Sequence, residues 1–169
     1  MQPWSPRSCR ARDLIVLDES GTAVTATYPF CAWETGHRVQ LAGRASVHSL
    51  CAIDALGAGA MLGCDTAIES SCRGCGAPVR IATRDRGHAL GPVAPGGAVV
   101  WSGIKYAGGC AATSGCTAKA FFCSDEHLAA WRERTEPHGA GFRLPMEAAL
   151  QTGKGLFVPM LADAAPGRP

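Results

Sequence analysis

Cys51 and Asp54 lie three residues apart in the segment SVHSLCAIDAL, which is otherwise mostly apolar. On a helix these two side chains would share a face, and the positive end of the helix dipole near its start would favour a thiolate. A carboxyl group among apolar neighbours is costly unless it is hydrogen-bonded or used in a reaction. The pair is therefore a candidate for chemistry. The alternative is a buried Cys51 that packs as a small hydrophobe, with Asp54 on a solvated edge.

The chain is rich in cysteine, and the number of cysteines is odd. No apolar segment follows the N-terminal arginines as it would in a signal peptide, so we expect a cytoplasmic protein with mostly free thiols. Thiols in this number favour a metal or redox explanation. Cys116 follows Gly115 at the start of an expected strand, where its thiol could face a cleft; a core or loop cysteine is the alternative. The nine cysteines are Cys9, Cys31, Cys51, Cys64, Cys72, Cys75, Cys110, Cys116 and Cys123.

Cys72 and Cys75 form a C-x-x-C motif in the segment SCRGCGAP, whose glycines suit a tight turn. Two thiolates at this spacing can chelate one zinc ion, but a structural zinc site usually needs a second pair. Cys110, Cys116 and Cys123 do not have that spacing, so we do not expect zinc at Cys72 and Cys75. A thioredoxin-like redox pair is disfavoured because the motif does not open a helix. The five histidines form no H-x-x-H or H-E-x-x-H motif, and we interpret them as surface or strand residues.

Length and composition indicate one globular domain. The chain has 169 residues, of which 47% are apolar and 18% charged. A net charge of +2 gives no argument for nucleic acid or an anionic membrane as partner. No apolar run approaches the ~18 residues of a membrane span. We expect an unstructured lead-in over residues 1–13, a single domain over 14–160 and a flexible tail over 161–169.

The pattern of apolar residues and turn signals predicts an α+β fold with antiparallel sheets, because clean βαβ alternation is missing. The expected strands form hairpins over 14–30 and over 66–84, with further strands at 37–43, 98–103 and 117–124. The expected helices cover 47–62, capped by Ser46, then 125–135, capped by Ser124, and 145–150, resuming near Leu156. The segment 91–97 is expected to be a loop.

Three segments, SLCAIDAL, SSCRGCGAPV and GCTAKAFF, occur in this order and at these separations. Together they resemble the bacterial organomercurial lyase (alkylmercury lyase) family, which carries a Cys-x-x-Asp on its central helix and a second active-site cysteine before an aromatic strand. The flanking segments YPFCAWETGHRVQL and HLAAWRER…MEAALQTG are also similar, so the resemblance covers about Leu14 to Leu156. It implies two ββαβ-like units that form small antiparallel sheets packed with short helices.

The resemblance assigns roles residue by residue. Cys51 and Asp54 match the first catalytic cysteine and the catalytic acid, Cys116 matches the second catalytic cysteine, and Cys72 matches a structural cysteine. The implied reaction is protonolysis, R–Hg⁺ + H⁺ to R–H + Hg²⁺, on a small organomercurial. Thiolates bind soft mercury, so Hg²⁺ would remain on Cys51 and Cys116, with Asp54 as a further candidate ligand. No metal cofactor is required, and cellular thiols or a mercuric reductase would accept the product.

The sequence departs from the family pattern in three ways. We expect a shortened N-terminal region, of which only the final hairpin is similar to the family. Thr117, Ala118 and Ala120 stand where the family often has another cysteine and histidines. Five cysteines have no family role, although Cys110, six residues before Cys116, could add a thiol near the site. These five are Cys31, Cys64, Cys75, Cys110 and Cys123.

Two other functions stay open at this point. One is a non-catalytic, thiol-based protein of the same fold that binds Hg, Cu or Zn, which the extra thiols and the shortened N-terminal region favour. The other is a C-x-x-C zinc domain that works as an interaction module. Asp54 favours the lyase, because a pure metal-binding protein needs no proton donor.

Overall fold

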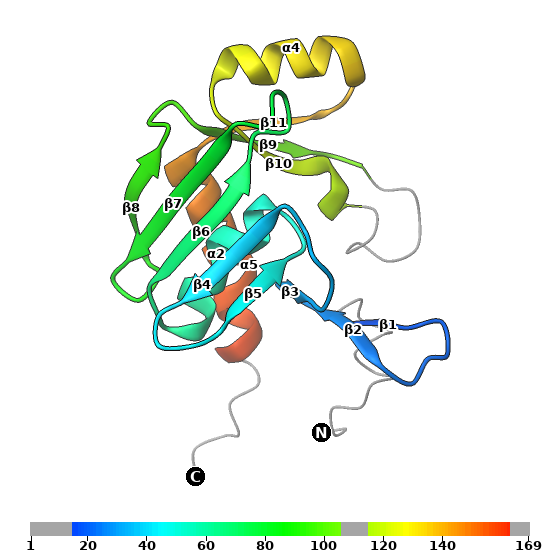
Figure 1. Cartoon of the computed structure of the whole chain (residues 1–169), viewed down its shortest axis with the longest axis vertical. Helices are drawn as coiled ribbons and strands as arrows, with labels where there is room; N and C mark the ends of the chain where they lie inside the picture. Colours follow the sequence, from blue (N-terminus) through cyan, green and yellow to red (C-terminus); the bar gives the residue numbers. More distant parts are fainter. Residues whose placement is uncertain (1–14, 106–114, 163–169) are drawn as a thin grey trace.

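The computed structural model describes residues 15–105 and 115–162, which form two antiparallel sheets packed with helices α2, α4 and α5 (Figure 1). The larger sheet has eight strands in the order β1-β2-β3-β5-β4-β6-β7-β8, and the smaller has three in the order β10-β9-β11. The α+β class with antiparallel sheets is therefore confirmed. The strands of the larger sheet are β1 (Ile15–Leu17), β2 (Val24–Thr27), β3 (Phe30–Cys31), β4 (His37–Leu41), β5 (Ser46–Ser49), β6 (Thr66–Ser71), β7 (Pro78–Arg84) and β8 (Ala89–Ala94).

The segment before the central helix is a strand, which corrects the helix expected from Val47. β5 (Ser46–Ser49) pairs with β4 on one side and with β3 on the other. These sheet hydrogen bonds outweigh the helical spacing of the apolar residues. Helix α2 (Ala52–Leu62) begins only after Cys51, which is its N-cap residue and has an extended backbone, with φ −156° and ψ 178°. Ser46 is therefore not the cap.

Helix α2 is buried on all sides, because it packs against α5 (Met146–Ala162) and against strands of both sheets (Figure 1). The two helices approach closely where Gly57 faces Gly153. A Cβ atom on Gly57 would lie 2.7 Å from the Gly153 carbonyl oxygen and 2.4 Å from Phe157 Cδ2. Glycine weakens an isolated helix, but here it permits the packing that holds α2 in the core.

The remaining elements confirm some expectations and correct others. The β6–β7 hairpin, β9 (Val99–Gly103), β10 (Lys119–Phe122) and α4 (Asp125–Thr135) all form. The expected loop at 91–97 is wrong in its first half, because β8 pairs with β7 through a register shift that accommodates Gly91 and Pro92. β11 (Gly141–Pro145) was not expected, and α5 continues without a break through the segment 151–155.

Several sequence predictions concern residues that the structure does not describe. The lead-in over 1–13 lies outside the described residues, as do Cys9 and Cys110. Of the expected tail, residues 161 and 162 belong to α5, and the rest is outside the described part. Among the described residues, no helix is both long and apolar enough to cross a membrane.

The two sheets meet around one hydrophobic core, to which Val39 and Ile68 contribute from the larger sheet and Phe121 and Phe122 from the smaller. A backbone hydrogen bond also joins them, since the Arg73 amide, in the turn after β6, donates to the Phe121 carbonyl in β10 at 3.0 Å. The segment that contains Cys116 therefore lies beside the buried start of α2.

Candidate active site

Cys51, Asp54 and Cys116 come together in the core, although 62 residues separate Asp54 from Cys116 in the sequence. The two sulfur atoms and a carboxylate oxygen all lie within 4.8 Å of one another. Cys116 Sγ is 3.5 Å from Asp54 Oδ2. All three side chains are buried, with exposed fractions of 0% for Cys51, 3% for Asp54 and 6% for Cys116. The three residues singled out from the sequence thus form one compact group.

Local structure explains how the three side chains reach this point. Cys51 ends the connection from β5 and caps α2, where its carbonyl accepts the first helical hydrogen bond, from the Ala55 amide at 2.9 Å. Asp54 follows in the first turn of the helix. Cys116 opens the short 3₁₀ helix η1 (Cys116–Ala118), which leads directly into β10. Both cysteines therefore sit at starts of regular elements rather than inside them.

Burial changes the chemistry of Asp54. Loss of water is the largest effect, and the charge of Cys116 adds to it, so that the pKa of the Asp54 carboxyl rises from 3.8 to about 8. At neutral pH the carboxyl group therefore holds a proton. An acid in this state can donate that proton to a neighbouring atom.

The two thiols differ from each other. Hydrogen bonding from Cys51, assisted by Tyr28, Asp54 and the charge of Lys119, outweighs burial and lowers the pKa of Cys116 to about 6. Burial, followed by contact with Cys116 and Asp54, raises the pKa of Cys51. At neutral pH the group therefore consists of a Cys116 thiolate, a Cys51 thiol and a protonated Asp54.

The sequence analysis missed three neighbours of this group. The Tyr28 hydroxyl lies 3.7 Å from Cys116 Sγ, and Lys119 Nζ donates to the Gly115 carbonyl at 2.8 Å. Cys31 is close enough that the charges of Asp54 and Cys116 help to raise the pKa of its half-buried thiol, although burial is the larger cause. Tyr28 and Cys31 lie in the segment YPFC, whose similarity to the family was the one available signal.

The other cysteines singled out from the sequence lie elsewhere or outside the described residues. Cys72 and Cys75 are not part of the group around Asp54; they lie with Cys123 and His127 in a second group. A structural role for Cys72 stays a prediction. Cys110, expected near the site, lies outside the described residues.

The fold and this group define an α+β protein whose buried thiols and protonated acid can bind a soft metal and donate a proton. A model of the family described as alkylmercury lyase matches residues 30–158. Among solved structures, the mercury-bound form of MerB2 matches with a TM-score of 0.76 and 25% sequence identity, over 89% of this chain and 70% of that chain. No curated protein sequence matches.

The chain therefore belongs to the alkylmercury lyase family. The resemblance drawn from the sequence is confirmed, and with it an enzyme that cleaves a carbon–mercury bond. The family implies an organomercurial as substrate and Hg²⁺ as product. The buried thiol and carboxyl group fits such a reaction.

Proposed function

We propose that the chain cleaves carbon–mercury bonds by protonolysis at Cys51, Asp54 and Cys116. The observation that carries the proposal is that two thiols and a carboxyl group, all buried, have their donor atoms within 4.8 Å of one another. Two sulfur ligands suit mercury, and the acid beside them suits proton delivery to carbon.

In the first step the Cys116 thiolate attacks mercury in R–Hg–X and displaces X⁻. The thiolate exists because the Cys116 proton has passed to Asp54, which agrees with the lowered pKa of the thiol and the raised pKa of the carboxyl. Cys51 then binds mercury as second thiolate. Its proton leaves to an external base, because metal coordination deprotonates a thiol.

In the second step Asp54 donates its proton to the carbon bound to mercury. Two thiolates increase the electron density on that carbon, so the carbon–mercury pair of electrons takes up the proton and R–H leaves. Hg²⁺ remains on Cys51 and Cys116, and Asp54 is now a carboxylate that can approach the ion as a further ligand.

Turnover requires that Hg²⁺ leave the two cysteines. Two external thiols, R′SH, take the ion as Hg(SR′)₂ and return two protons, which restore the starting group. Cellular thiols or a mercuric reductase would serve as acceptor. We place this reaction in the reducing cytoplasm, because the seven described cysteines are free thiols.

The test mixes the reduced protein with phenylmercuric acetate and excess thiol, and follows benzene by gas chromatography. We expect catalytic benzene from the wild type, and none from Cys51→Ser or Cys116→Ser. Cys64→Ser is the matched control, because Cys64 is a half-buried thiol outside this group. It should turn over at the wild-type rate.

Other outcomes would change the assignment. Near-wild-type benzene production by Cys51→Ser or Cys116→Ser would remove that thiol from the reaction. Tight stoichiometric mercury binding without benzene would replace the enzyme with a thiol-based metal-binding protein of the same fold.

A further inference from the structure

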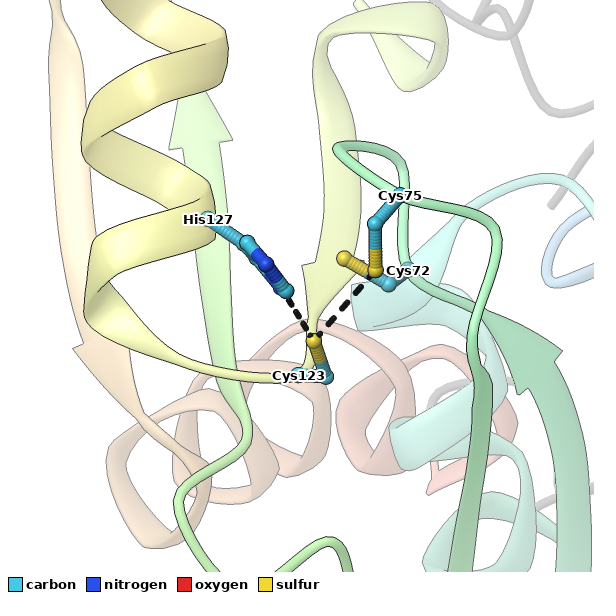
Figure 2. A group of neighbouring side chains, drawn as sticks. All are labelled: Cys72, Cys75, Cys123 and His127. Carbon is cyan, nitrogen blue, oxygen red and sulfur yellow. Dashed lines mark hydrogen bonds between the residues drawn. The ribbon is translucent and has the colours of Figure 1, made fainter.

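A second group of metal-ligating side chains lies outside the candidate active site. Cys72 and Cys75 come from the turn between β6 and β7, Cys123 follows β10, and His127 is in the first turn of α4. One donor atom of each residue lies within 4.8 Å of those of the other three. Figure 2 shows that the four side chains point toward one another from these three places.

The turn with Cys72 and Cys75 has the backbone of a metal-binding knuckle. The Gly76 amide donates to the Cys72 carbonyl and the Cys72 amide donates to the Ala77 carbonyl, both at 2.8 Å. Gly76 has a φ of +77°, in the left-handed region that favours glycine.

The knuckle is built to approach the start of α4. A Cβ atom on Gly74 would lie 2.9 Å from the His127 carbonyl oxygen, so only glycine permits this distance. The start of the helix is defined by Ser124, whose hydroxyl accepts from the His127 amide at 3.3 Å. This cap holds the Cys123–His127 pair in position opposite the knuckle.

The distances suit one small ion. Cys75 Sγ and Cys123 Sγ are 3.6 Å apart, close to the separation of about 3.8 Å expected for two sulfurs that each lie ~2.3 Å from a tetrahedral zinc ion. His127 Nδ1 is 2.7 Å from Cys123 Sγ. Binding of both atoms to one zinc ion would increase this distance by somewhat less than 1 Å. The exposed imidazole can make that movement by side-chain rotation.

We infer that Cys72, Cys75, Cys123 and His127 bind a structural zinc ion. Three thiolates and one imidazole form a complete tetrahedral ligand set, which leaves no open position for a substrate. The spacing is C-x-x-C followed by C-x₃-H, so the second pair contains a histidine. The sequence analysis looked for a second pair of cysteines and therefore missed it.

The zinc ion would connect the two sheets. The knuckle belongs to the larger sheet, and Cys123 belongs to the segment that leaves the smaller one. Arg73, between the knuckle cysteines, donates from its amide to the Phe121 carbonyl and from its guanidinium to the Thr117 carbonyl. The ion would therefore also restrain the segment that begins with Cys116.

The experiment measures zinc in reduced wild-type protein, purified without chelator, by plasma mass spectrometry. We expect about one zinc ion per chain. Co²⁺ added to the reduced apoprotein should give the visible d–d bands of a tetrahedral site and a sulfur-to-cobalt charge-transfer band. Absence of zinc, together with failure of the reduced apoprotein to bind Zn²⁺ or Co²⁺, would overturn the inference.

Paired variants locate the ion. Cys75→Ser and His127→Gln change exposed ligands and should weaken zinc binding by at least about 100-fold. Their matched controls, Cys64→Ser and His138→Gln, change residues outside the group and should bind zinc as the wild type does. Cys75→His keeps four ligands and should restore zinc binding, which a merely structural effect of the substitution would not do.

Two outcomes contradict the assignment. Zinc that is retained by both Cys75→Ser and His127→Gln does not depend on these ligands. Zinc that is lost in Cys116→Ser but retained in Cys75→Ser belongs to the group around Asp54 instead. Neither outcome affects the benzene assay, so the zinc site and the proposed lyase reaction fail independently.

Discussion

The proton on Asp54 determines the pH range of the proposed reaction. The pKa of its carboxyl is raised to about 8 by burial and by the charge of Cys116, and that of the Cys116 thiol is lowered to about 6 by hydrogen bonding from Cys51. Attack requires the thiolate, and proton delivery requires the acid. The active form is therefore populated mainly between these two values.

We accordingly expect kcat/KM to rise with pH near 6 and to fall near 8. Asp54→Asn should lower kcat by at least about 100-fold, because the amide cannot donate the proton, yet should still bind Hg²⁺ with Cys51 and Cys116. Benzene release from phenylmercuric acetate across pH 5–9 measures the profile. A rate that stays constant up to pH 9 would show that Asp54 does not deliver the proton.

The carboxyl group of Asp54 also makes the free energy of unfolding depend on pH. Its pKa is 3.8 in an unfolded chain and about 8 in the fold, so between these values the folded state holds a proton that the unfolded state has lost. This contribution to stability is complete below pH 4 and is lost as the pH rises to about 8.

Asp54→Asn should remove the decrease in stability that the wild type shows as the pH rises from 4 to 8. The gain of the variant over the wild type in free energy of unfolding should grow between pH 4 and pH 8, reaching on the order of 2 kcal/mol. Urea unfolding of both proteins at pH 5 and pH 8.5 measures the free energy of unfolding. The comparison of variant with wild type isolates the effect of Asp54, because the titration of Cys116 changes stability with pH in the opposite direction in both proteins. The expectation is wrong if the difference in free energy of unfolding between Asp54→Asn and the wild type is the same at pH 5 and at pH 8.5.

At the scale of elements, the contact between α2 and α5 controls the position of the reacting group. Gly57→Ala would bring a methyl group into the Gly153 backbone and the Phe157 ring, so the helices must separate. We expect a loss of about 2–3 kcal/mol in the free energy of unfolding. Gly155→Ala, in α5 with no atom within 4 Å of the new Cβ, is the control and should gain up to ~1 kcal/mol. Thermal unfolding of both variants tests this, and equal effects would contradict it.

Helix caps and tight turns were predicted correctly from the sequence, because residues close together in the chain stabilise them. Ser124 caps α4 as its sequence indicates, and the C-x-x-C turn joins β6 to β7. The segment before Cys51 was misassigned because Val47 and Leu50 have helical spacing, while its strand depends on partners in β3 and β4. The local sequence of a segment does not reveal which strands it will pair with.

The candidate site was predictable to a similar extent. Cys51 and Asp54 stand out by spacing, although Cys51 caps the helix instead of lying within it. Cys116 was assigned to the same site only through the family resemblance, because it lies far from Cys51 and Asp54 in the sequence and no local pattern connects them. The approach of Cys123 and His127 to the knuckle depends on how the two sheets pack, which no short motif reveals.

At the scale of the whole molecule, stability in acid depends on a buried histidine between the sheets. His37 packs edge-on against Phe121, and Nδ1 lies 2.9 Å from Ser70 Oγ. Burial, with a smaller effect of Arg73, lowers the pKa of its imidazole from 6.5 to about 4. Between these values the unfolded state binds a proton that the fold excludes, so stability falls as the pH decreases.

We expect this histidine to cost about 2 kcal/mol of stability between pH 7 and pH 5. His37→Gln should lack that part of the decrease, whereas His138→Gln, which changes an exposed histidine, should retain it. Urea unfolding of metal-free proteins at both pH values makes the comparison. An equal decrease in His37→Gln and in the wild type would exclude His37 as the cause.

The shape of β8 bears on how copies of the molecule behave toward one another. β8 is an edge strand of the larger sheet, and an unprotected edge strand can hydrogen-bond to a strand of a neighbouring copy. Here Gly91 and Pro92 interrupt the pairing register, and Pro92 has no amide hydrogen to offer. The feature that made this segment look like a loop thus hinders the molecules from joining edge to edge into aggregates in a crowded cell.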